Sequence, residues 1–350
     1  MSLRCGIVGL PNVGKSTLFN AMTKTQAAEA ANYPFCTIEP NIAKVPEYDP
    51  RLVQIAEISK AEKTIFSQLE IVDIAGLVQG ANQGEGLGNK FLSHIREVDV
   101  IIHVLRCFSD DDIRHVHGKV DPLYDAEIIK MELLLADMQS LENRLKKSKT
   151  SKQLMEDALE ILKKGDLHST ELLDERFKEL QLLTSKPMLY VCNVEQENIL
   201  SGNKFSTQIA EFAKTSNMES VVVSAAIEAE IALLESDEDR KVFLNEFGLE
   251  ESQLNKVIRL GSRLLDLIVF FTAGEKEARA WSIKRNSTAP QAAGTIHTDF
   301  EKKFIKAETI SFSDYIEFGG EQKCKSLGKM RIEGREYIVQ DGDIIHFKHG

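Results

Sequence analysis

A glycine-rich stretch near the start of the chain has the residue types and the spacing that bind phosphate groups. It reads GLPNVGKST over residues 9–17, matches the pattern G-x-x-x-x-G-K-S/T, and lies between an expected strand and an expected helix. Its glycines let backbone N–H groups surround phosphate oxygens, and the helix N-terminus adds positive potential. Lys15 can bridge the β- and γ-phosphates, and the Ser16 hydroxyl can ligate Mg²⁺. We therefore predict a nucleotide-binding loop whose contact residues are Asn12, Val13, Gly14, Lys15, Ser16 and Thr17.

Two further segments supply groups that a bound magnesium triphosphate needs. Asp73 ends an expected strand and begins the sequence DIAG, which runs to Gly76. A carboxylate at this position can hold the magnesium shell, and the Gly76 backbone N–H can approach the γ-phosphate. Thr37 lies in the loop after the first helix and can complete the Mg²⁺ coordination, although a plain surface threonine is the alternative. The predicted metal ligands are Ser16, Thr37 and Asp73.

Strand-like and helical segments alternate through the part of the chain that must position these groups. Apolar runs typical of strands occupy residues 3–9, 67–73, 98–105, 187–193 and 220–224, with helical stretches between them. This alternation predicts an α/β fold with a parallel sheet and right-handed crossovers.

Two other segments differ from this pattern. Between residues 126 and 184, three series of apolar residues recur at helical, near-heptad spacing, which predicts a helical insertion over 122–186. The insertion is either an ordinary packed layer or a protruding arm that contacts a partner. After residue 270, short β-like runs at 280–283, 304–310, 337–339 and 344–347 indicate a small α+β module. The expected domains are therefore residues 1–271, interrupted by the insertion, and residues 272–350.

Composition excludes several classes of protein. Hydrophobic residues make up 43% of the chain, which argues against general disorder, and no apolar run is long enough to span a bilayer. The absence of a signal-peptide pattern and of any cysteine framework favours a cytoplasmic protein. The net charge of −11 argues against a protein that binds nucleic acid over most of its surface. The charge is uneven, however, because residues 275–350 hold 13 Lys+Arg against 12 Asp+Glu.

Several longer stretches resemble a known group of proteins. The segments GLPNVGKST, YPFCTIEPN and DIAGLVQGANQGEGLGNKFL resemble the Obg-related GTPases, and FFTAGEKEARAW and GTIHTDFEKKFIKAE narrow the resemblance to the YchF family of ribosome-binding ATPases. The resemblance extends along essentially the whole chain. It implies a P-loop NTPase domain with a coiled-coil helical insertion and a C-terminal TGS domain, a β-grasp module. It also implies the ribosome or its large subunit as a partner through the TGS domain and the helical arm, with no membrane contact; we expect a monomer.

The chain departs from the usual GTPase pattern next to the reacting phosphate. Leu77 stands where Ras-like enzymes use a glutamine to orient the attacking water, and its side chain cannot hydrogen-bond. The resemblance points to a histidine in a mobile loop, for which His115 is the match and neighbouring His117 the weaker candidate; the alternative is a solvated loop residue. In related enzymes an asparagine at the position of Asn12 helps to hold K⁺, although Asn12 can equally serve only to shape the loop.

A second departure concerns the base. The guanine signature is Asn-Lys-x-Asp, but here the chain reads Asn193-Val194-Glu195-Gln196, and even the pattern usual in the family, Asn-x-x-Glu, is not kept. A neutral amide cannot reproduce a charged bidentate pair with guanine, so we expect ATP to be favoured and GTP tolerated. A GTP-specific GTPase and a nucleotide-regulated scaffold remain the alternatives. The expected base contacts are Asn193, Val194, Gln196, Ser224, Ala225 and Ala226.

Overall fold

The computed structural model of the 350-residue chain describes residues 3–30, 41–74, 87–110, 118–147, 151–166 and 171–350, without the side chains of 25–30, 87–90 and 237. The chain divides into two compact units, residues 1–45 with 70–261 and residues 46–69 with 262–350. The expected boundary after residue 271 places residues 46–69 with the nucleotide domain. In the structure they group with the C-terminal residues because Leu52 and Ile55 pack into that unit's core. The functional domain boundaries themselves stay predictions.

The main sheet of the first unit is a parallel one, as its alternating pattern predicts. Its order is β2-β4-β1-β5-β6-β7, and β1 is a central strand because Gly6 pairs with Val72 of β4 and with Ile101 of β5. Every residue of β5 and of β6 is buried, which suits strands covered on both faces. The strands are β1 (Arg4–Val8), β2 (Ile42–Glu47), β4 (Ser67–Asp73), β5 (Val100–Arg106), β6 (Met188–Asn193) and β7 (Glu219–Val223).

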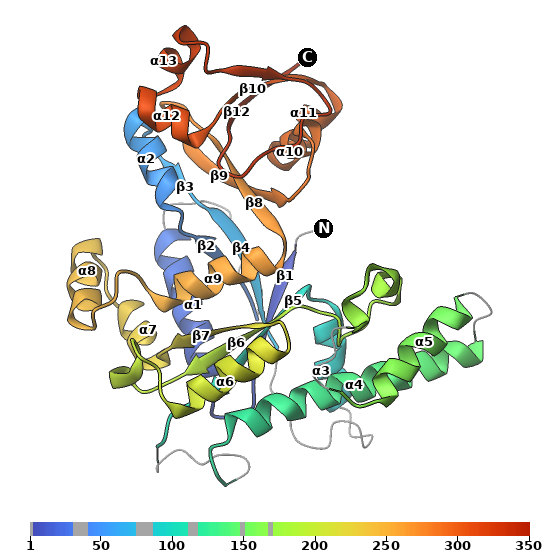
Figure 1. The fold of residues 1–350 in the computed structure, drawn as a ribbon. Coiled ribbons are helices and arrows are strands. Elements are labelled where there is room, and N and C mark those ends of the chain that lie inside the picture. Colours follow the sequence, from blue (N-terminus) through green and yellow to red (C-terminus); the bar gives the residue numbers. More distant parts are fainter. Residues whose placement is uncertain (1–2, 31–40, 75–86, 111–117, 148–150, 167–170) are drawn as a thin grey trace. The chain divides into compact units, whose positions relative to one another are not determined.

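Helices accompany this sheet and connect its strands (Figure 1). Outside the insertion they are α1 (Lys15–Ala30), α3 (Leu87–Arg96), α6 (Lys204–Thr215), α7 (Ala225–Ile231), α8 (Asp237–Glu246) and α9 (Gln253–Leu264), with a short 3-10 turn η4 (Gln196–Asn198) after β6. Among the described residues, no helix has both the length and the apolar character to cross a bilayer.

The insertion is a helical hairpin with a core of its own. Helix α4 (Pro122–Lys147) and helix α5 (Lys152–Lys163) lie side by side and bury a shared apolar cluster. The third apolar series, expected to be a helix, is instead two short 3-10 turns, η2 (Glu171–Leu173) and η3 (Glu175–Leu180). Asp174 starts a new turn by accepting the Arg176 N–H, and Gln181 ends it at φ 52°, so no long helix can form. Phe177 still packs into the hairpin core.

The second unit contains a mixed sheet of order β11-β10-β12-β8-β9-β3. Its strands are β3 (Thr64–Ile65), β8 (Leu267–Thr272), β9 (Ala278–Lys284), β10 (Phe304–Ile310), β11 (Arg331–Glu333) and β12 (Ile344–His349); its helices are α2 (Pro50–Ser59), α10 (Ala289–Ile296), α11 (Thr298–Lys302), α12 (Phe312–Phe318) and α13 (Glu321–Ser326). The expected strand over residues 337–339 is wrong, since only Ile338 forms a single bridge, to Thr288. The assignment of this unit as a TGS domain stays a prediction.

Candidate nucleotide-binding site

The glycine-rich loop joins β1 to α1, which is the position that its motif requires. Gly14 has φ +92°, and a Cβ atom there would lie 2.3 Å from the Asn193 Nδ2 atom. A Cβ atom on Gly9 would lie 2.8 Å from the Val104 carbonyl oxygen. Both positions therefore accept only glycine without rearrangement, because the loop is packed against the ends of the neighbouring strands β5 and β6.

Lys15 and Asp73 meet at the mouth of this loop. The Lys15 ammonium group contacts the Asp73 carboxylate, and the side chains are 11% and 19% exposed. Register explains the meeting, because Ile7 of β1 pairs with Asp73 of β4 and its carbonyl accepts the Ile74 N–H at 3.1 Å. The structure thus brings together two of the predicted site residues, and the carboxylate compensates the lysine charge.

The first turn of α1 presents the groups expected to hold phosphate and metal. Ser16 and Thr17 are exposed, and the helical hydrogen bonding begins with Leu18 N–H to the Gly14 carbonyl at 3.0 Å. The earlier N–H groups of the turn can therefore meet an anion. A hydroxyl from Ser16 and a carboxylate from Asp73 are hard oxygen donors of the kind that Mg²⁺ prefers. Among the described residues, no three His, Cys, Asp or Glu side chains lie close enough together to hold a metal ion by themselves.

Asn193 ties three loops together at the end of β6. It is 4% exposed, its Nδ2 donates to the Val13 carbonyl, and its Oδ1 accepts the Ala225 N–H, both at 2.9 Å. Its backbone carbonyl also accepts the Cys107 N–H at 2.8 Å. Asn193 thus joins the phosphate loop to the two loops expected around the base. In this arrangement its side chain positions the loops, whereas the sequence alone indicated a direct contact with the purine.

The three residues after Asn193 have different surroundings. Val194 is 3% exposed, and its N–H donates to the Val223 carbonyl at 2.9 Å, so it belongs to the core. The Glu195 carboxylate is engaged by other segments, because it accepts the Ser109 N–H at 2.8 Å and the Asn203 side-chain N–H at 3.1 Å. Gln196 is half-buried and donates to Glu230 at 3.4 Å. A neutral amide beside a carboxylate therefore stands where guanine-specific proteins place aspartate.

The loop at residues 224–226, expected to contact the base, is held by a residue that the sequence did not single out. Ser224 is buried and its hydroxyl has no hydrogen-bond partner among the described residues, while Ala226 is exposed. Glu228, in the same helix α7, accepts the Ser252 hydroxyl at 2.6 Å and the Gln253 N–H at 2.7 Å. Burial raises the pKa of Glu228, and these hydrogen bonds oppose the rise. Glu195 and Glu228 carried no local signal because their partners come from distant segments.

Three predicted site residues, Thr37, Gly76 and His115, lie outside the described residues, as do Leu77 and His117. The chain that leads toward residue 115 is nevertheless described. Arg106 ends β5 at 1% exposure and donates to the Phe108 carbonyl at 3.2 Å and to the Asp110 carbonyl at 3.0 Å. The described chain is therefore anchored as far as Asp110, next to the end of β6 at Asn193.

A loop of this kind after the first strand of a parallel sheet, with an acidic residue ending the adjacent strand, is the arrangement that P-loop nucleoside triphosphatases share. Two family models match the chain. The model described as "50S ribosome-binding GTPase" matches residues 4–136, and the YchF-GTPase C-terminal model, described as "Protein of unknown function (DUF933)", matches residues 267–350.

Full-length relatives narrow the class further. The chain is 51% identical to the ribosome-binding ATPase YchF of Bacillus subtilis and 52% identical to that of Escherichia coli O157:H7, each over 99% of both chains. The solved YchF GTPase of Schizosaccharomyces pombe superposes with a TM-score of 0.85 at 37% identity, over 99% of this chain and 98% of the other. The chain belongs to the YchF family.

Proposed function

We propose that this protein hydrolyses ATP in preference to GTP, with Mg²⁺, as a ribosome-associated switch. The observation that carries the base preference is the loop after β6, where Gln196 replaces the guanine-reading carboxylate and Glu195 is held away by Ser109 and Asn203. The bacterial relatives are named ATPases, whereas the fission-yeast structure is named a GTPase. Because these names differ, we infer the nucleotide preference from the residues of this chain that are expected to contact the base.

The amide of Gln196 suits adenine for a geometric reason. A glutamine side chain offers one donor and one acceptor, which is the pairing that reads the N6 and N7 edge of adenine. Guanine recognition needs an acceptor pair for its N1 and N2 hydrogens, which a single amide oxygen cannot supply. GTP binding would then leave base donors unpaired, at a cost of about 1–3 kcal/mol for each buried group.

The phosphate end of the site supports hydrolysis over a purely structural role. Lys15 is placed to exchange the Asp73 carboxylate for the β- and γ-phosphates of an incoming nucleotide. Mg²⁺ would be held by Ser16, Asp73 and Thr37 and would neutralise charge that develops on the phosphate oxygens. The Gly76 backbone N–H is proposed to meet the γ-phosphate. A K⁺ ion beside Asn12 would add positive charge near the phosphates. Turnover should then be faster in K⁺ buffer than in matched Na⁺ buffer, and equal rates would contradict a role for K⁺.

The ribosome link rests on the names of the bacterial relatives and on the near-neutral charge of residues 275–350. Deleting residues after 271 is a poor test, since it would remove β9, β10 and β12, whose residues form the core around Leu52 and Ile55. Neutralising exposed Lys323 and Lys325 keeps that core and should weaken co-sedimentation with ribosomes in a salt-dependent way.

Phosphate release from ATP and from GTP tests the proposed base preference. Gln196→Asp restores a carboxylate and should move the ratio of kcat/KM values toward GTP. The single change is preferable to a double change with Val194→Lys, because Val194 is buried and a lysine there would bury a charge. Gln208→Asp, on the exposed face of α6, is the matched control. An unchanged ratio in Gln196→Asp would show that Gln196 does not read the base.

A further inference from the structure

The carboxylate of Glu195 joins two segments that lie far apart in the sequence. One of its oxygens accepts the Ser109 N–H at 2.8 Å, and the other accepts the side-chain N–H groups of Asn203 at 3.1 Å and of Asn198 at 3.2 Å. One donor comes from the segment after β5 and two come from the segment after β6. Because both oxygens are engaged, the carboxylate holds the backbone of its own loop in a defined place.

Asn203 is itself held in place by the start of α6. Its Oδ1 accepts the N–H groups of Phe205 at 3.0 Å and of Ser206 at 3.1 Å, which caps the helix. Its Nδ2 donates to the Cys107 carbonyl at 2.6 Å as well as to Glu195. Glu195 is therefore anchored to the beginning of a helix and to the chain that follows β5.

Gln196 follows Glu195 directly and begins the 3-10 turn η4. Glu195 caps this turn with an extended backbone (φ −61°, ψ 156°), and its carbonyl accepts the Asn198 N–H at 3.1 Å. Both the side chain and the carbonyl of Glu195 thus hold Asn198. The Gln196 amide donates to Glu230 at 3.4 Å, which is a long hydrogen bond, so the place of the amide depends mainly on the backbone of the turn.

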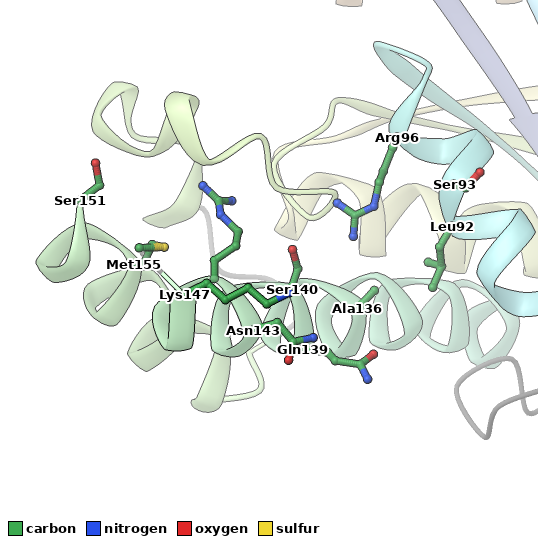
Figure 2. Close-up of a pocket in the computed structure, with 11 residues that line it drawn as sticks. Leu92, Ser93, Arg96, Ala136, Gln139, Ser140, Asn143, Lys147, Ser151 and Met155 are labelled. Carbon is green, nitrogen blue, oxygen red and sulfur yellow. The ribbon is translucent and has the colours of Figure 1, made fainter. Parts of the chain in front are cut away.

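The groove between α3 and α4 is not built from the loops expected around the base. It encloses about 630 Å³, and Figure 2 shows the residues that line it, which include none of the predicted base contacts. Those contacts, at 193–196 and 224–226, instead lie where β6 and β7 end. Recognition of the base then depends on how firmly these loops are held.

An amide at position 195 cannot replace the carboxylate. A carboxylate meets the three N–H donors with two acceptor oxygens, whereas a glutamine has one oxygen and brings two N–H donors of its own. In one orientation of the amide, its nitrogen would face the Ser109 N–H. In the other orientation, its nitrogen would face the N–H groups of Asn198 and Asn203. Either orientation sets donor against donor and loosens the turn that carries Gln196.

We propose that Glu195 is a positioning residue for base recognition, which holds Gln196 where its amide can meet adenine. The inference rests on the proposed reading of the base by Gln196 and adds to it the group that fixes the reader. Glu195 acts on the nucleotide through its neighbour. Its contribution to affinity therefore vanishes for a ligand without a base and in a protein whose residue 196 has no amide.

The test is a double-mutant cycle on the full-length protein with Glu195→Gln and Gln196→Ala. Titration calorimetry with Mg²⁺ measures the affinity for ATP, for GTP and for inorganic tripolyphosphate, which has no base. Glu195→Gln should weaken ATP binding by about tenfold in the presence of Gln196 and by less than about twofold in the Gln196→Ala background. Tripolyphosphate affinity should equal that of the wild type, which also shows that the variant is folded.

Glu197→Gln is the matched control, because it removes the same charge from an exposed position of the same turn and should leave ATP affinity unchanged. An equal loss of ATP affinity in both backgrounds would overturn the inference, and so would an equal loss for ATP and tripolyphosphate. Gln196→Ala alone tests the proposed base reading, which an unchanged ratio of ATP to GTP affinity refutes. A changed ratio in Gln196→Ala together with wild-type ATP affinity in Glu195→Gln refutes the role of Glu195 alone.

Discussion

The ammonium group of Lys15 lies against the carboxylate of Asp73, which joins the phosphate loop to the end of the neighbouring strand β4. Substrate binding must replace this contact by contacts with phosphate. Lys15→Ala removes the charge that faces the β- and γ-phosphates, so we expect turnover to be lost and nucleotide affinity to fall. Phosphate release and nucleotide titration measure both effects. Wild-type turnover in this variant would refute the site assignment, and Lys24→Ala, at an exposed position later in α1, is the control.

We expect Asn193 to contribute equally to the affinity for ATP and for GTP. Asn193→Ala removes its hydrogen bonds to the Val13 carbonyl and the Ala225 N–H, both buried, at a cost of about 1–3 kcal/mol for each group left without a partner. Affinity for ATP and for GTP should fall by a similar factor, because the variant loosens loops and removes no base-specific contact. Parallel titrations test this, with Asn245→Ala on exposed α8 as the control. A selective loss of one nucleotide would mean that Asn193 reads the base directly.

Lys130 gives the stability a dependence on pH. It is 9% exposed, its Nζ donates to the Ser216 hydroxyl at 3.1 Å, and burial lowers its pKa to about 8, although Asp166 and Glu127 oppose the change. The unfolded chain therefore holds more protons between about pH 8 and 10.5, and the free energy of unfolding rises with pH across that window.

Lys130→Met removes the cost of burying this charge. Near pH 7 the variant should be more stable than the wild type by roughly 1–2 kcal/mol, and the gain should shrink as the pH approaches about 10. Urea denaturation of both proteins at the two pH values measures the difference. Lys146→Met, on the exposed face of the same helix, should show no such trend. A difference that does not change with pH would contradict the assignment to Lys130.

His115 is the proposed group that positions the attacking water, since Leu77 cannot hydrogen-bond. His115→Ala should lower kcat while ATP affinity stays near that of the wild type, which marks an interaction made mainly in the transition state. Single-turnover rates and direct titration separate the two quantities. His117→Ala is the matched control and should be nearly silent. A normal kcat in His115→Ala would show a solvated loop residue with no part in the reaction.

Local patterns predicted the features that depend on local sequence. The phosphate loop, its strand and helix, and the buried strands β5 and β6 follow from motif and apolar runs, and the structure has them at those places. The helix expected through Phe177 and Leu180 was wrong, because Asp174 caps a new turn that the apolar spacing did not reveal. The roles of Glu195 and Glu228 could not be predicted, since each depends on hydrogen-bond partners that only the folded chain brings near, Ser109 lying 86 residues from Glu195.

The grouping of residues 46–69 with the C-terminal unit could not be predicted either, because it also depends on contacts between segments far apart in the sequence. The sequence marks α2 as an amphipathic helix, and Leu52 and Ile55 could pack against any apolar surface. Only the tertiary structure shows that this surface is formed by β8, β9 and β12.

Direct titration of the wild-type protein with ATP and with GTP, both with Mg²⁺ and under the same conditions, measures which base the proposed site prefers. We expect tighter binding of ATP, because Gln196 offers an amide to the base and the carboxylate of Glu195 is engaged elsewhere. A tenfold preference for GTP, about 1.4 kcal/mol in the opposite direction, would contradict it.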